Sequence, residues 1–138
     1  MPEGSGIDAN EKYPVVIFFH GLGEGGNGDS DLHEVLIHGP PKIINANLSD
    51  NVFVDNNAIM LAPQVTNNTW WNDGHIRPFL DYVIEKYQVD ENRIYFTGLS
   101  AGSSGINDFL DDDPQAHQIA ATTVLAVRGV VTLPGGGY

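Results

Sequence analysis

The chain has 138 residues, enough for one domain with a buried core, and 41% of them are hydrophobic while 17% are charged. Its 18 acidic side chains outnumber the 6 basic ones and give a formal net charge of −12, which excludes nucleic acid and anionic membrane surfaces as expected partners. The sequence contains no cysteine, which excludes disulfides and thiolate chemistry and leaves the redox compartment open.

The first predicted strand covers residues 15–19, a continuous run of β-branched and aromatic side chains that suits a strand buried on both faces of a parallel sheet. This run is far shorter than a membrane span, and no leader-like segment precedes it, so we expect a soluble protein, cytoplasmic or secreted after leader removal. A glycine-rich loop follows. Apolar residues then recur at helical spacing from residue 32, and Pro40 and Pro41 are expected to interrupt this helix.

The second predicted strand lies in the apolar run "AIMLAPQ" and is stopped by Pro63. After a loop containing two tryptophans, residues 76–87 show the strongest helical pattern in the chain. The third predicted strand covers residues 93–98, and a further helix over 100–113 is ended by Pro114.

The tail is open to two interpretations. It forms either one helix followed by a strand at 130–133, or two short strands that turn at 128–129. Strands that alternate with helices predict one α/β domain over residues 1–138, with a mainly parallel sheet of about four to five strands. The acidic run at 111–113 is expected to be a solvated helix end.

The pentapeptide "GLSAG" at residues 98–102 matches the pattern GxSxG. A predicted strand runs into it and a predicted helix runs out of it, which is the context of a nucleophile elbow. In such a turn the Oγ of Ser100 projects at the carboxyl edge of the sheet, and the backbone N–H of Ala101 points at a developing oxyanion. The alternative is a glycine-rich turn made only for packing.

The segment "FFHGLGEGG" offers a second oxyanion donor, the N–H of Leu22, in a loop at the end of the first strand. The same loop matches the spacing GxGxxG over residues 21–26, which is the basis of a nucleotide-binding alternative. Glu24 inside the loop would repel a pyrophosphate, and the GK[ST] ending of a P-loop is missing, so this alternative is disfavoured.

Together these pieces resemble the α/β-hydrolase superfamily, in particular small carboxylesterases, depolymerase-like members and prolyl-oligopeptidase-type serine hydrolases. The matching segments are "KYPVVIFFHGLGE", "HGPPK", "IMLAPQ", "WW" and "FLDYVIEKYQVDENRIYFTGLSAG", in the family's order. The resemblance implies a reduced α/β-hydrolase core, a three-layer sandwich. It also implies that Ser100 is the nucleophile and that Leu22 and Ala101 are the oxyanion donors.

For the substrate pocket the resemblance implies Gly21, Trp70 and Trp71, although the two tryptophans could equally cover the core. The family's catalytic acid and histidine follow two later strands, and we expect those strands, like the family's flanking N-terminal strands, to lie outside residues 1–138. Among the histidines present, His75 is a weak candidate for the base, and His20 is expected to hold the loop by hydrogen bonds. His117 is expected at the surface.

We therefore expect a serine carboxylesterase that hydrolyses small neutral carboxylic esters through an acyl-enzyme on Ser100. The alternative is a catalytically incomplete hydrolase-like binding module. Neither a cofactor nor a metal is expected, because a calcium site on Asp29 and Asp31 or on the acidic run would need convergent oxygen ligands. The edges of a sheet this small favour association, so a homo-oligomer is also expected.

Overall fold

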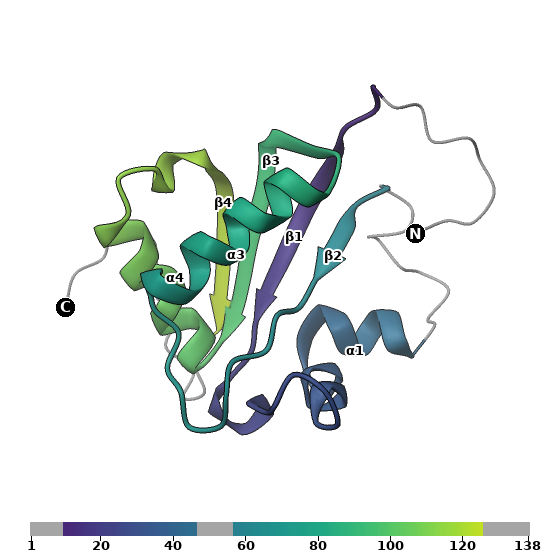
Figure 1. Ribbon diagram of the computed structural model, residues 1–138, viewed down its shortest axis with the longest axis vertical. Helices are drawn as coiled ribbons and strands as arrows, with labels where there is room; N and C mark the ends of the chain where they lie inside the picture. The colour runs from purple at the N-terminus through teal and green to yellow at the C-terminus, as the bar shows by residue number, and fades with distance from the viewer. Residues whose placement is uncertain (1–9, 47–56, 126–138) are drawn as a thin grey trace.

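The computed structural model describes residues 10–46 and 57–125 (Figure 1). Its centre is a four-stranded sheet in the order β2-β1-β3-β4, in which every neighbouring pair is parallel. The predicted α/β class is confirmed, and the architecture is consistent with a reduced α/β-hydrolase core. The strands are β1 Tyr13–Phe19, β2 Ile59–Leu61, β3 Val89–Leu99 and β4 Ile119–Leu125.

Helices connect the strands as crossover segments, as parallel pairing requires. The α-helices are α1 Gly39–Asn45, α3 Asp73–Lys86 and α4 Ala101–Asp112, and the 3-10 turns are η1 Leu22–Glu24, η2 Leu32–Leu36 and η3 Ala116–Gln118. In Figure 1 the arrowheads of the strands point to the lower end of the sheet, where η1 and the start of α4 lie. That end carries the candidate site.

The main core lies between the sheet and the pair α3 and α4. Alternate residues of β1, among them Ile17 and Phe19, point to this side and are fully buried. Phe19 makes edge contacts with Phe96 of β3 and with Trp71, each with ring centroids 5.0 Å apart. Burying one such ring contributes about 2 to 3 kcal/mol, so this aromatic group fixes where α4 meets the sheet.

The opposite face of the sheet is covered at its carboxyl end by α1. Phe18 points to this face, because its side chain alternates with that of Phe19. Gly39 begins α1 with a φ of +62°, and a Cβ at this position would lie 2.6 Å from Cε2 of Phe18. Glycine is therefore required both for the backbone conformation and for the close contact. With α1 on this face, the described residues form the three predicted layers.

The helix expected from residue 32 differs from the prediction. It is divided into η2 and α1, and Pro40 and Pro41 stand at the first positions of α1 instead of interrupting a longer helix. Proline suits the first turn, since its missing N–H has no partner there in any case. In the tail, residues 119–125 form β4, while 128–129 and 130–133 lie outside the described residues.

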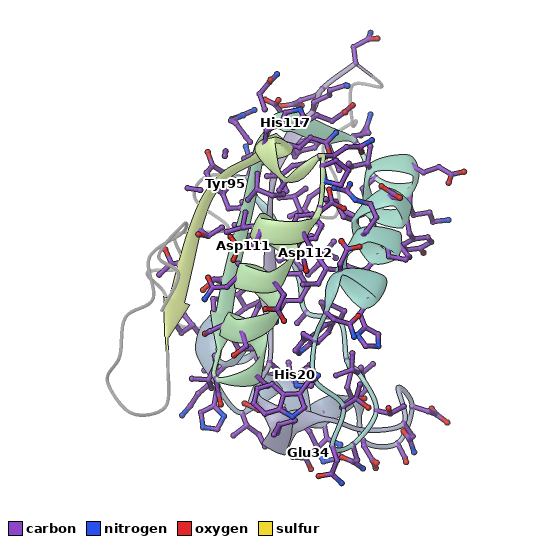
Figure 2. All side chains as sticks on the ribbon, turned by 90° about the vertical axis from the view of Figure 1, so that its left-hand side faces the viewer. His20, Glu34, Tyr95, Asp111, Asp112 and His117 are labelled. Atoms are coloured by element: carbon purple, nitrogen blue, oxygen red, sulfur yellow. The ribbon has the colours of Figure 1, made fainter. Side chains whose placement is uncertain are left out.

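An ion pair joins α3 to the end of α4, where a solvated helix end was expected. Asp111 and Asp112, labelled on α4 in Figure 2, are exposed as predicted, but the side chain of Asp113 is only 5% exposed. It accepts two hydrogen bonds from the guanidinium of Arg77, of 2.6 and 2.8 Å. The prediction was wrong for Asp113 because consecutive residues of a helix point in directions about 100° apart, and Asp113, just past the end of α4, lies against Arg77 of α3.

The hydrogen bonds of the Arg77 guanidinium lower the pKa of Asp113 from 3.8 to about 2. A lowered folded-state pKa contributes stability above pH 3.8 that is lost as the pH falls toward 2. Burial and the neighbouring Asp113 raise the pKa of Asp73, which offsets part of this loss. We expect the urea midpoint to fall between pH 4.5 and pH 2, and to fall less in Asp113→Asn. An equal fall in this variant would contradict the assignment.

The sheet edges and the lengths of the helices bear on two expectations from the sequence, association and solubility. Among the described residues β2 and β4 each pair with one strand, so both are sheet edges, and association through them stays a prediction. No helix of the described part is long and apolar enough to cross a membrane.

Candidate active site

Ser100 occupies a strained turn between β3 and α4. Its φ of 53° and ψ of −113° lie in a region that residues other than glycine rarely adopt. Leu99 ends β3 and Ala101 begins α4, so a single residue connects strand and helix. This is the strand-to-helix context that the GxSxG pattern predicts, and it places Ser100 at the carboxyl end of the sheet.

The glycines on either side of Ser100 are required by close backbone contacts. A Cβ on Gly98 would lie 2.8 Å from the carbonyl carbon of Gly102. A Cβ on Gly102 would overlap the carbonyl group of Phe19 and lie 2.9 Å from the carbonyl oxygen of His20. The absence of a Cβ at these two positions therefore allows α4 to start directly against the backbone of β1.

The loop after β1 lies against the same turn. A Cβ on Gly21 would lie 3.5 Å from Cβ of Ser100, so the two backbones are neighbours. Leu22 is the first residue of η1 and Ala101 is the first residue of α4. N–H groups in the first turn of a helical segment have no acceptor within it, and the dipole of α4 favours a negative charge at its start. These two N–H groups are thus suited to an oxyanion.

His20 is fully buried and holds the loop through both ring nitrogens. Its Nδ1 is hydrogen-bonded to the carbonyl of Gly21, and its Nε2 accepts a 3.1 Å bond from the N–H of Val65. Both bonds are satisfied by a neutral ring with the proton on Nδ1. The expectation that His20 holds the loop agrees with this geometry, since neither nitrogen is available to take a proton from Ser100.

Gln64 is a second support of the loop, and the sequence analysis missed it. Its Nε2 donates to the carbonyls of Glu24 (3.0 Å) and Asp31 (2.8 Å), while its Oε1 accepts from the N–H of Gly28 (2.9 Å). The amide thus connects three points of the loop, residues 24, 28 and 31. Its position just after the second strand could have indicated this role. Because β2 and β1 are parallel neighbours, a residue that follows β2 lies near the loop that follows β1.

The two tryptophans were expected either to line a substrate pocket or to cover the core, and they differ in burial. Trp71 is 2% exposed and belongs to the core, where its indole N–H donates a 2.9 Å bond to the carbonyl of His20. Trp70 is 55% exposed and leaves an aromatic face toward solvent. Its role in a substrate pocket stays a prediction.

Two other histidines were considered as the base or as a surface residue. His75, in the first turn of α3, has a buried Nδ1 without a hydrogen-bond partner in the described part of the chain, and its ring is 6.3 Å from that of Trp71. His117 is exposed, and Figure 2 shows it at the opposite end of the molecule from His20. None of the described histidines forms a hydrogen bond with the side chain of Ser100.

The nucleotide-binding alternative does not fit the loop. A dinucleotide fingerprint opens an α-helix, whereas residues 21–26 contain the 3-10 turn η1 and lead to another 3-10 turn, η2. Glu24 is buried within it, which puts a negative charge where a pyrophosphate would bind. Among the described residues no group of three acidic or histidine side chains is arranged to hold a metal ion.

No protein-family model and no curated protein matches this chain. Among solved structures it is similar to one described as the crystal structure of a thermostable esterase, with a TM-score of 0.61 and 24% sequence identity. The similarity covers 84% of this chain and 33% of the esterase, so the chain spans about a third of that protein's length. At this identity the similarity establishes the fold.

Proposed function

We propose that this protein is a serine hydrolase that cleaves small neutral carboxylic esters through an acyl-enzyme on Ser100. The observation that carries the proposal is the strained backbone of Ser100 at the start of α4, directly beside Gly21. Strain of this kind persists only where the surroundings impose it, and it is typical of functional positions. The similarity to an esterase supports the same chemistry.

In this mechanism Oγ of Ser100 attacks the ester carbonyl and its proton passes to a base. The carbonyl oxygen becomes an oxyanion that accepts hydrogen bonds from the N–H groups of Leu22 and Ala101. The base returns this proton to the leaving oxygen as the tetrahedral intermediate expels the alcohol, and water then hydrolyses the acyl-enzyme. His75 is the candidate base because its Nδ1 is free of hydrogen bonds among the described residues. A neutral substrate agrees with the net charge of −12.

A second candidate function is a hydrolase-like binding module without turnover. It is favoured by the histidine contacts, since no described histidine is hydrogen-bonded to Ser100 and His20 is fully used by the loop. A serine with an oxyanion site but no base retains catalysis of ~10³ over water, so weak ester hydrolysis would not separate the two candidates.

A fluorophosphonate probe separates them, because Oγ must displace fluoride from phosphorus and therefore needs a base. We expect stoichiometric labelling at neutral pH, located at Ser100 by mass spectrometry and abolished in Ser100→Ala. The variant His75→Ala should lower the labelling rate at least tenfold, while His117→Ala, at the other end of the molecule, should not. Folded protein that remains unlabelled would exclude the esterase and leave the binding module.

A further inference from the structure

The loop that carries Leu22 contains a buried carboxylate. Glu24 is 5% exposed and ends the turn η1 that begins at Leu22. Glutamate is almost never buried to this degree unless it is paired. We propose that Glu24 and His38 form a positioning pair that holds the N–H of Leu22 toward Ser100. The proposal rests on the ester hydrolysis proposed above, in which neither residue touches the substrate.

The first oxygen of Glu24 is anchored by His38. Oε1 lies 2.8 Å from Nδ1 of His38, a distance that makes an ion pair when the ring is protonated, and among the described residues Oε1 has no hydrogen-bond partner. The side chain of His38 is 55% exposed, and its backbone directly precedes Gly39, which packs on the ring of Phe18 and starts α1. The pair therefore ties the loop to the layer on the far face of the sheet.

The second oxygen of Glu24 faces the candidate site. A Cβ on Gly21 would lie 3.0 Å from Oε2 of Glu24 and 3.5 Å from Cβ of Ser100, so Gly21 stands between the carboxylate and the serine. The carboxylate therefore packs against the backbone that leads to the N–H of Leu22.

The turn has weak bonds of its own. Its two backbone hydrogen bonds, from Glu24 to the carbonyl of Gly21 and from Gly25 to that of Leu22, are 3.4 and 3.5 Å long. Bonds at this length contribute little. Side-chain anchors must therefore hold the turn, and Glu24 provides the anchor on the side of Ser100.

The charge of the pair makes its two members unequal. An ionised carboxylate beside the site opposes the negative charge that develops on the substrate oxygen, and the ring of His38 offsets that charge when both of its nitrogens are protonated. Removing His38 leaves the carboxylate both unanchored and uncompensated, whereas removing the charge of Glu24 releases the turn but also removes the opposing charge. A purely structural contact would not produce this asymmetry.

The test compares Glu24→Gln, His38→Gln and the double variant in the full chain. His38→Gln should lower the rate of fluorophosphonate labelling and kcat for a simple aryl ester about tenfold with little change in KM, because the oxyanion forms only in the transition state. Glu24→Gln should lower both about threefold, and the double variant should resemble Glu24→Gln. His33→Gln removes an exposed pair with Glu34 (3.2 Å) and is the matched control.

Hydrogen exchange gives a readout that does not depend on activity. Peptides covering residues 20–26 should exchange faster in both single variants and remain unchanged in His33→Gln. Unchanged exchange in these peptides would overturn the positioning pair, whatever the labelling. If exchange responds as expected but the unmodified protein is not labelled at Ser100, the ester hydrolysis is wrong and the pair stands.

Discussion

Replacing Gly102 by alanine is expected to lower the free energy of unfolding by about 3 kcal/mol or more, and the melting temperature by about 10 °C. The new Cβ would overlap the carbonyl group of Phe19, and the carbonyl oxygen of His20 lies 2.9 Å away. Both contacts are with backbone atoms of β1 or of the residue after it. These atoms cannot move away as the end of a flexible side chain can. The higher helix propensity of alanine, about 1 kcal/mol, is too small to compensate.

The matched control is Gly23→Ala, where an added Cβ meets nothing within 4 Å. This change should leave stability equal or raise it by about 0.5 kcal/mol, because alanine restricts the unfolded chain. Urea denaturation followed by tryptophan fluorescence measures both variants. If Gly102→Ala had the same urea midpoint as the unmodified protein, the start of α4 would not be in close contact with β1.

Arg77→Met is the second large effect, with an expected loss of about 2 to 3 kcal/mol. The Arg77 side chain is 17% exposed, forms two hydrogen bonds with Asp113 and lies 5.0 Å above the ring of Phe109. Without the guanidinium, the carboxylate of Asp113 stays buried without its cation, next to Asp73. An uncompensated buried charge costs more than the pair itself contributes.

The double variant Arg77→Met with Asp113→Asn tests this reason. It should be more stable than Arg77→Met alone, because the orphaned charge is removed. Arg93→Met, which breaks an exposed pair with Asp90, should leave the unfolding midpoint nearly unchanged. Equal losses for Arg77→Met and Arg93→Met would show that the bond between α3 and the end of α4 contributes no more than a surface pair.

Most of the fold could be predicted from the sequence because its signals are local. The continuous apolar run of β1 and the strand, glycine and helix around Ser100 each depend on a few adjacent residues. Prolines 40 and 41 misled the prediction, since proline ends one helix and begins another with equal ease, and only the packing of Gly39 on Phe18 decides between the two.

The parts of the candidate site that have local sequence signals could also be predicted. The turn at Ser100 and the neighbouring loop have local patterns, and the role of His20 agreed with expectation. The bonds of Gln64 to Glu24 and Asp31, and the pair formed by His38, connect residues that are distant in the chain or belong to different elements. They depend on which strands become neighbours, and no local pattern encodes this.

The supports of the loop after β1 also determine when it can form. His20 is bonded to a residue 45 positions later in the chain, its carbonyl to one 51 positions later, and Glu24 to one 40 positions later. Parallel neighbours can only be joined by such long crossovers, so closing these contacts carries a large entropic cost during folding. The surroundings of Ser100 are consequently complete only after three separate stretches of chain have met.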